Sequence, residues 1–315
     1  MAYVAKLTID NTKVSADATD FPVFVNLANL NATFWSTVAN GGGDIRIFKA
    51  DGVTELAREV VSCATGTSTG ELHFKFTGTL SASVDTVVQI HADGVASDYA
   101  VGATYGRNAV WTDYRVVIHG GAVTDSSGNI TPTASGNSSS TTAKVGGNST
   151  ALSSGTGSEI ATGSITGRTV TMWAYNTAGN TAGYFLDART GLANGWSYRD
   201  NGGGQINFGG SWSTVFLNAS SATSGVTTLA NSTWGYLAYK ASAGWTDDLF
   251  FGNRHTARVT DDSWVGNFDE LRVTKTIDLA SSWITTEYNN QNSPATFYTI
   301  TTPPSANTGA FFAFF

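Results

Sequence analysis

The sequence predicts an all-β protein made of two antiparallel β-sandwich domains. Three observations support this fold class: short runs in which apolar and polar residues alternate, turn-forming Gly, Asn and Asp between those runs, and a single segment with the pattern of a helix. Alternation with a period of two places one face of a strand in a core and the other in solvent. A chain of 315 residues is long for one domain and ordinary for two.

Residues 1–100 are predicted to form the first sandwich. Pro22 lies in the second alternating run and favours an edge strand, because proline cannot donate a ladder hydrogen bond. His73 and His91 occupy the polar positions of later runs, so we expect both on solvent-facing sides of strands. The predicted strands cover Tyr3 to Ile9, Phe21 to Leu27, Glu71 to Phe76 and the region of Val88 to Ile90.

Residues 101–108 are predicted to be a linker, residues 109–302 a second sandwich, and residues 303–315 a tail. A stretch rich in Ser, Thr, Gly and Asn interrupts the second sandwich at 124–158, and loops of that length are usually functional or mobile. The helical segment covers 279–290, with Asp278 as its N-cap and Pro294 after its end. Further strands are predicted at 115–119, 168–175, 184–188, 233–239, 249–251 and 268–273.

Composition excludes several classes of protein. The net charge is −7, with 17 basic and 24 acidic residues, whereas nucleic-acid binding uses clustered Lys and Arg. No apolar run approaches the roughly 18 residues of a membrane-spanning helix, so we expect no membrane insertion. The single cysteine, Cys63, excludes an intramolecular disulfide and a cysteine-based zinc site. The first twenty residues read as a strand and not as a secretory signal peptide.

Both halves resemble known modules. The second resembles the concanavalin-A-like, laminin-G-like jelly rolls, and the first resembles an uncharacterised β-domain that often precedes them in bacterial and phage surface proteins. That superfold hosts lectins, adhesins, glycosidases and structural spacers, so the resemblance implies a fold and not an activity. The residues that carry it are Asp125 to Asn129, Met172-Trp173, Gly266 to Val273, Trp283, Glu287, Tyr288 and Phe297-Tyr298 in the second half, and Phe21 to Val23 and Gly43 to Arg46 in the first.

No catalytic residue is predicted. Retaining glucanases of the resembled fold carry Glu-x-Asp-x-x-Glu on one strand, and the sequence has no such string. Asp269 and Glu270 are adjacent and would point to opposite faces of a strand, so we expect them to order a turn or to pair with Arg272. No nucleophile-elbow motif lies near any of the four histidines. We therefore predict that the chain is not an enzyme.

The resemblance implies calcium as the one cofactor to consider, because laminin-G-like modules commonly hold a cation at one rim with loop carboxylates and carbonyl oxygens. The alternative is that Asp and Asn occupy these turns because they hydrogen-bond to their own backbone. The candidate metal ligands are Asp125, Asn129, Asp247, Asp248, Asp261 and Asp262.

A glycan site would need exposed aromatic side chains that stack on sugar rings. Trp245 beside Asp247 and Asp248 is the preferred rim contact. The alternative is that these side chains fill the core, as expected for Trp173 and Trp234, since large aromatics dominate core burial. The candidate glycan-binding residues are Trp245, Trp212, Trp196 and Tyr198.

The chain ends in four phenylalanines, Phe311, Phe312, Phe314 and Phe315, after Pro303-Pro304. Burial of each Phe is worth about 1.5–3 kcal/mol, and soluble monomers rarely expose such a patch. We predict that this tail anchors the chain in a neighbouring copy or another protein; the alternative is that it folds back on its own domain.

Together these features predict a non-enzymatic virion structural protein, associated with a phage head, tail or fibre, that is made in the host cytoplasm and could contact host-surface glycan. Its partners would be other virion proteins or copies of itself. The alternative is a carbohydrate-binding module or adhesin that is extracellular or on a bacterial cell surface. A glycosidase is disfavoured, because the usual pair of carboxylates is missing from the sequence pattern.

Overall fold

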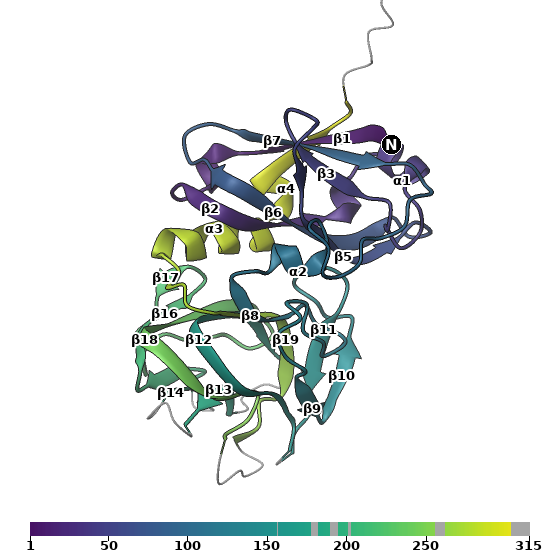
Figure 1. Ribbon diagram of the computed structural model, residues 1–315. Coiled ribbons are helices and arrows are strands. Elements are labelled where there is room, and N and C mark those ends of the chain that lie inside the picture. The colour runs from purple at the N-terminus through teal and green to yellow at the C-terminus, as the bar shows by residue number, and fades with distance from the viewer. Residues whose placement is uncertain (156, 178–181, 190–194, 201–202, 256–261, 304–315) are drawn as a thin grey trace, which may run out of the picture.

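A computed structural model describes residues 1–155, 157–177, 182–189, 195–200, 203–255 and 262–303 of the chain. It confirms the predicted all-β class: antiparallel strands make up about half of the described chain, and the helices are short. One sandwich, from the N-terminal third, lies at the top of Figure 1, and the second lies below it. No helix among the described residues has both the length and the apolar character needed to cross a bilayer.

The first sandwich packs a five-stranded sheet, β20-β1-β7-β3-β4, against a three-stranded sheet, β2-β6-β5. Inward-facing side chains of the alternating runs, such as Leu7, Val23, Phe74 and Ile90, meet in one buried core. β2 is an edge strand, as Pro22 predicted. The strands are β1 Ala2–Ile9, β2 Ala18–Asn26, β3 Arg46–Lys49, β4 Glu55–Leu56, β5 Arg58–Ala64, β6 Thr69–Leu80, β7 Thr86–Ala92 and β20 Tyr298–Thr301.

The C-terminal segment returns to the first sandwich. After the short helix α4 (Pro294–Phe297), β20 pairs antiparallel with β1, and Phe297 and Tyr298 are buried in the first core. The hydroxyl oxygen of Tyr298 accepts a hydrogen bond of 2.9 Å from the backbone N–H of Asn26. The prediction that the second sandwich extends to residue 302 is therefore corrected. Residues 298–301 form the edge strand of the five-stranded sheet in the first sandwich, next to β1. Alternation along a strand gives its faces and not the identity of its neighbours.

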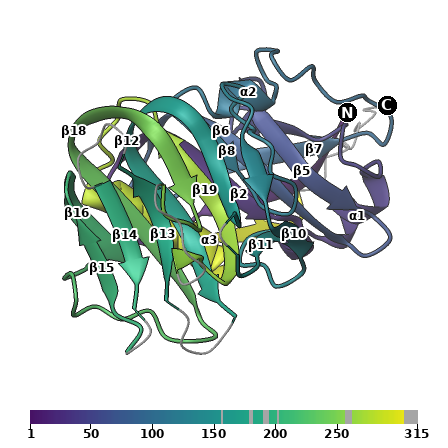
Figure 2. The same cartoon turned by 90° about the horizontal axis from the view of Figure 1, so that it is seen from below.

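The second sandwich is one continuous hydrogen-bonded sheet wrapped around its own core, in the order β10-β11-β19-β12-β18-β13-β14-β15, with β8, β9, β16 and β17 joined to it. The long strands β12 and β18 pair with two register shifts, and their curvature is visible in Figure 2. The strands are β8 Tyr114–Ile118, β9 Thr133–Ser135, β10 Asn137–Ser140, β11 Ser149–Leu152, β12 Glu159–Asn176, β13 Gly183–Ala188, β14 Gly195–Arg199, β15 Ile206–Gly209, β16 Trp212–Leu217, β17 Ser220–Ser221, β18 Trp234–Phe251 and β19 Gly266–Thr274.

The remaining helices are α1 (Ala32–Thr37), α2 (Arg107–Val110) and α3 (Ser281–Asn292), with 3-10 turns at Asn11–Lys13 and Leu27–Asn29. α3 confirms the predicted helix and its stop before Pro294, but Asp278 is not its N-cap. The Asp278 carboxylate instead pairs with Arg168 at 3.4 Å and Lys240 at 3.3 Å, because the helix starts later, after Ala280. α2 occupies the end of the predicted linker and continues it into the second sandwich.

Helix α3 joins the two sandwiches, and it lies between them in Figure 1. Asn290 exchanges two hydrogen bonds with the backbone of Phe24 in β2, at 2.7 and 2.9 Å. The next residue, Gln291, accepts a hydrogen bond of 2.6 Å from the indole N–H of Trp173 in β12. A small apolar cluster that includes Phe24, Trp173 and Ile284 fills the space between them. The second sandwich consequently covers the outer face of the β2-β6-β5 sheet.

Candidate functional site

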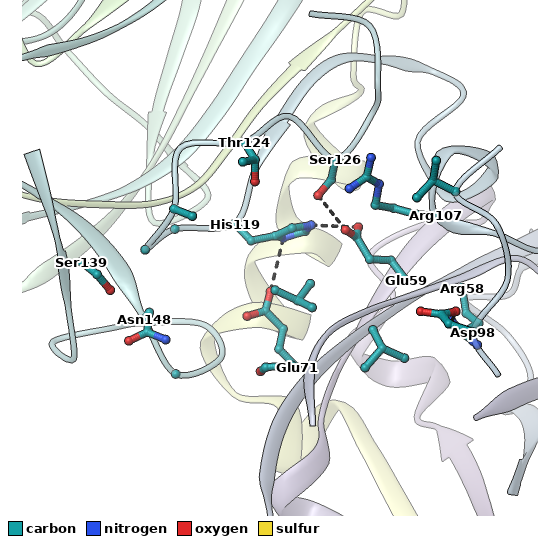
Figure 3. Close-up of a pocket in the computed structure, with 18 of the residues that line it drawn as sticks. Arg58, Glu59, Glu71, Asp98, Arg107, His119, Thr124, Ser126, Ser139 and Asn148 are labelled. Carbon is teal, nitrogen blue, oxygen red and sulfur yellow. Dashed lines mark hydrogen bonds and ion pairs between the residues drawn. The ribbon is translucent and has the colours of Figure 1, made fainter. Parts of the chain in front are cut away.

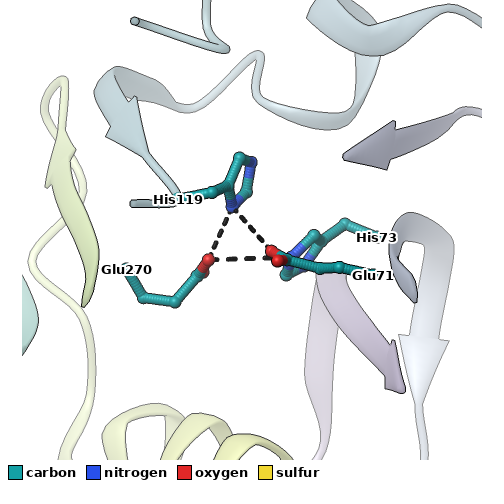
Figure 4. A group of neighbouring side chains, drawn as sticks. All are labelled: Glu71, His73, His119 and Glu270. Atoms are coloured by element: carbon teal, nitrogen blue, oxygen red, sulfur yellow. Dashed lines mark hydrogen bonds and ion pairs between the residues drawn. The ribbon is translucent and has the colours of Figure 1, made fainter. Parts of the chain in front are cut away.

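A cluster of charged side chains is buried where the two sandwiches meet (Figure 4). None of its members is more than 5% exposed, although charged side chains are rarely buried unless they are paired or bind a metal. Strands of both sandwiches contribute to it. The junction cluster consists of Glu59 on β5, Glu71 and His73 on β6, His119 directly after β8, and Glu270 and Arg272 on β19.

Strand alternation aims the first three of these residues at the junction. On β6, Leu72 and Phe74 point into the first core, so Glu71 and His73 point to the opposite face. Glu59 lies across from His73 in the register of β5 and β6. The prediction that His73 faces solvent is wrong, because the second sandwich covers this outer face and leaves the imidazole 0% exposed. His91 is partly exposed and stacks on Tyr3.

A β-bulge on β19 sets the directions of the Asp269 and Glu270 side chains. Asp269 lies opposite Trp173 and Arg272 opposite Thr171, so β19 holds one more residue than β12 over this interval, and Glu270 has a φ of 51°. Asp269 accepts hydrogen bonds from the backbone N–H groups of Lys144 and Val145, at 2.8 and 2.9 Å. Glu270 forms an ion pair with Arg272. Both predicted roles of this pair, the ordering of a turn and the bond to Arg272, are confirmed.

His119 lies between carboxylates on both sides of its ring. Its Nδ1 is 2.6 Å from Glu270 Oε1 and 3.3 Å from Glu71 Oε1, and its Nε2 is 3.0 Å from Glu59 Oε2. Burial disfavours the imidazolium, but the charges of Glu270 and Glu59 outweigh it and raise the pKa of His119 well above its ordinary value. Burial likewise opposes ionisation of Glu270, yet His119 and Arg272 hold its pKa well below the usual range. The cluster therefore contains a buried cation between anions.

The pH dependence of stability should reflect this arrangement in chelator-treated protein. Because the folded pKa of His119 is raised, its contribution is complete below the unfolded pKa of about 6.5 and is lost as the pH rises through the folded value. The lowered pKa values of Glu59 and Glu270 make their contributions complete above about 4.5 and lost as the pH falls. Urea unfolding of the wild type and His119→Gln should differ more at pH 5.5 than at pH 9; an equal difference at both pH values would contradict this assignment.

A cleft of about 400 Å³ opens above the cluster, and its floor includes Glu59, Glu71 and His119 (Figure 3). The hydroxyl of Ser126 donates a hydrogen bond of 2.6 Å to Glu59. Both sandwiches line the cleft, mostly with polar groups. The other side chains that line it include Arg58, Asp98, Tyr99, Arg107, Thr124, Ser139 and Asn148, and Gly120, Gly121 and Gly147 leave space between them.

The structure does not place the predicted aromatic residues at this cleft. Trp212 and Trp245 are 6% and 3% exposed in the core of the second sandwich, so the prediction of rim contacts there is corrected. The stretch around Trp245 is the interior of strand β18 and not a loop, which turns the indole inward. Trp196 and Tyr198 are partly exposed on β14, where Tyr198 packs against Tyr184.

Of the predicted calcium ligands, Asp125 and Asn129 form hydrogen bonds within their own turn. The two oxygens of Asp125 accept five hydrogen bonds from residues of its own turn and from Val117, which leaves the turn-forming alternative. The side-chain amide of Asn129 donates to the Tyr114 carbonyl and to the Ser127 hydroxyl. Asp247 and Asp248 are consecutive on β18 and point to opposite faces. Asp262 lies 3.9 Å from Arg254. Asp261 and the tail residues Phe311, Phe312, Phe314 and Phe315 lie outside the described residues.

The junction cluster was missed by the sequence analysis, although one signal was present. Glu71 and His73 are two residues apart on a strand and therefore share a face, which is a spacing that suits a polar site. Their partners Glu59, His119 and Glu270 come from three other segments, and no sequence pattern connects these segments to β6.

No protein-family model matches the sequence, and no curated protein does. Among solved structures, domain 4 of an extracellular GH43 arabinanase from Geobacillus stearothermophilus, in complex with arabinotriose, is similar with 16% identity and a TM-score of 0.37, over 55% of this chain and 98% of that domain. A Trypanosoma rangeli sialidase, as a covalent intermediate, is similar with 12% identity and a TM-score of 0.38, over 70% of this chain and 42% of the sialidase. This chain therefore spans less than half of the sialidase.

These findings correct two predictions. The similar structures are parts of glycosidases, and none of those named is a virion protein, so the prediction of a non-enzymatic virion structural protein is withdrawn, and with it the prediction that the chain is not an enzyme. At these identities and scores the likeness reaches only to a β-sandwich architecture, and no residue role is transferred from these proteins.

Proposed function

We propose that this chain binds carbohydrate in the cleft between its two sandwiches. The observation that carries the proposal is the lining of that cleft: carboxylates, an imidazole, hydroxyls and an amide converge on about 400 Å³, close to the lower end of the usual range for small-molecule sites. A polyhydroxylated ligand matches such a lining, because each sugar hydroxyl can donate to a carboxylate and accept from an amide or hydroxyl.

The positions of individual groups support a sugar over an apolar ligand. Asn148, Thr124 and Ser139 are exposed on one side of the cleft, with side chains available for hydrogen bonds to a ligand. Tyr99 is among the residues that line the cleft, and its ring is packed against Arg46, whose guanidinium lies 4.1 Å from the ring centroid.

Two groups on the floor of the cleft, Glu59 and His119, can also transfer a proton. The Glu59 carboxylate, whose pKa is lowered because His119 and Ser126 outweigh its burial, touches the protonated His119 ring. A base and an acid in contact at the bottom of a cleft are an arrangement that can move a proton to or from a bound ligand. Release of reducing ends from a polysaccharide panel would show whether the bound glycan is cleaved.

Substitution of Gly147 by tryptophan should abolish glycan binding without loss of stability. A Cβ atom at Gly147 meets nothing within 4 Å, so the indole can extend into the cleft that this residue lines. The matched control is Gly66→Trp, where a Cβ also meets nothing within 4 Å and which does not line the cleft. A glycan array should show binding by the wild type and by Gly66→Trp and none by Gly147→Trp. An array without signal for the wild type, or equal signal for all three, would refute the proposal.

We also propose that the second sandwich is a concanavalin-A-like jelly roll and that the protein acts outside the cell or on its surface. Two observations support the first part: the antiparallel order of its strands around one core, and the turn at Asp125, which is built by the carboxylate of the resembled motif. Detection of the protein on intact cells with an antibody would test the second part.

A further inference from the structure

We propose that Glu71, His73, His119 and Glu270 form a site for a divalent transition-metal ion such as zinc, at the floor of the cleft. One ligand atom from each of these four side chains lies within 4.8 Å of the other three. Two imidazoles and two carboxylates are a ligand set that proteins use for zinc and related ions. The inference does not depend on the glycan proposal, because binding of the ion can be measured without any sugar.

The spacing of the ligand atoms suits a single ion. His119 Nδ1 lies 2.6 Å from Glu270 Oε1 and 3.3 Å from Glu71 Oε1. His73 Nε2 lies 2.9 Å from Glu71 Oε1 and 3.8 Å from Glu270 Oε1. Four ligand atoms at 2.0–2.2 Å from a tetrahedral zinc ion are about 3.3–3.6 Å apart. The distance between His119 and Glu71 already fits this range. The distance between His119 and Glu270 would have to widen by about 0.7 Å, and the two distances of His73 would change by about 0.4 and 0.2 Å.

Neighbouring side chains orient two of the four ligands, His119 and Glu270, as they do in most protein metal sites. The second nitrogen of His119, Nε2, is bonded to Glu59, and Glu59 is fixed in turn by the Ser126 hydroxyl and the Trp111 indole, at 2.6 and 2.5 Å. A carboxylate on the far nitrogen of a ligating histidine fixes which nitrogen faces the ion. Glu270 directs its other oxygen, Oε2, to Arg272, so Oε1 stays directed at the histidines.

Charge balance also favours a cation at this point. The described groups that are directly bonded in and around the junction cluster include four carboxylates, those of Glu59, Glu71, Glu270 and Glu287. Arg272 is the one permanent cation among them, and a histidine must be neutral to ligate a metal, so the two imidazoles add no positive charge to the loaded site. Buried carboxylates are costly without compensation, and a divalent ion would supply it.

The ion has a path to the site, because Glu71 and His119 line the cleft as well as the cluster (Figures 3 and 4). Gly146 lies against Glu71 so closely that a Cβ at this position would overlap its carboxylate. The backbone there is in the left-handed region, with a φ of 63°, which favours glycine. This contact holds the Glu71 carboxylate at the junction.

The test is a titration of the chelator-treated full chain with Co²⁺, which reports ligand geometry through its visible absorption, followed by displacement with Zn²⁺. The wild type should bind one ion per chain with the intense bands of a four-coordinate site, and Zn²⁺ should abolish them. Glu71→Gln keeps the shape of the side chain and removes its charge, and His73→Gln removes one imidazole; each should weaken binding more than 100-fold. Glu59→Gln changes a residue that bonds His119 and is not itself a ligand, so it should weaken ion binding about 10–100-fold.

The matched control is His91→Gln, on β7 in the other sheet of the first sandwich and outside the cluster, which should bind as the wild type does. Circular dichroism of each variant shows whether it is folded, and Glu71→Gln keeps the test informative if His73→Gln fails to fold. Absence of binding by the folded wild type at millimolar Co²⁺ and Zn²⁺, or binding that Glu71→Gln and His73→Gln leave unchanged, would overturn the proposal. Neither outcome bears on glycan binding, which the array measures separately.

Discussion

Replacement of Arg272 by methionine is expected to lower the free energy of unfolding by about 3–5 kcal/mol. The guanidinium is buried, pairs with Glu270, and lies 3.5 Å from the carboxylate of Glu287. Its Cζ is 4.8 Å from the centroid of the Trp111 ring, a contact that methionine can largely fill. The loss therefore comes mainly from two buried carboxylates that are left without their cation. Urea unfolding at pH 7 measures it.

The control for this prediction is Arg168→Met. Arg168 also pairs with a carboxylate, that of Asp278 at 3.4 Å, but Asp278 is 42% exposed, and such surface pairs contribute about 0–1 kcal/mol. A loss of less than 1 kcal/mol for Arg272→Met, similar to that of the control, would show that the junction cluster is hydrated in solution and is not the buried network described above.

Replacement of Phe297 by alanine is expected to destabilise the protein by about 3–5 kcal/mol, the usual cost of removing a fully buried phenyl ring. Phe297 is 0% exposed in the core of the first sandwich, although the buried residues of that core other than Phe297 and Tyr298 all come from positions before 93. Its backbone carbonyl accepts a hydrogen bond of 3.0 Å from the N–H of Asp10, next to β1. The residue thus closes the first sandwich from the far end of the chain.

Thermal and urea unfolding would measure this loss, with Ile277→Ala as the control. Ile277 is 42% exposed, so its replacement should change stability by no more than about 0.5 kcal/mol. If Phe297→Ala were equally mild, the C-terminal segment would not be an integral part of the first sandwich, and the predicted boundary at residue 302 would regain its support.

The sequence was sufficient for the fold class, because period-two alternation is a local property. The strands predicted at Tyr3 to Ile9 and Phe21 to Leu27 form with the expected inward faces, the second ending at Asn26, and α3 ends before Pro294 as predicted. The pairing of β20 with β1 could not be predicted in the same way, since nearly 300 residues separate the two strands and alternation does not specify a neighbour.

The candidate site could not be predicted from the sequence, because its residues meet only when the two sandwiches pack together. Strand alternation puts His73 on the outer face of β6 as expected, but the predicted solvent exposure is wrong, because the second sandwich buries that face. Glu270 depends on a bulge with a positive φ, which its own sequence does not indicate, since such backbone is usually occupied by Gly, Asn or Asp. Trp245 shows the converse error: it was expected at an exposed rim, but the segment continues as β18 with its indole inside.

The central claim is that the ligand binds at the junction of the two sandwiches. A crystal structure of the protein soaked with the strongest ligand from the glycan array tests it most directly. We expect the sugar in the cleft, with hydroxyls within hydrogen-bond distance of Glu59 and of Asn148 or Thr124. A sugar stacked instead on the partly exposed Trp196 and Tyr198 of β14, with the cleft unchanged, would contradict the claim.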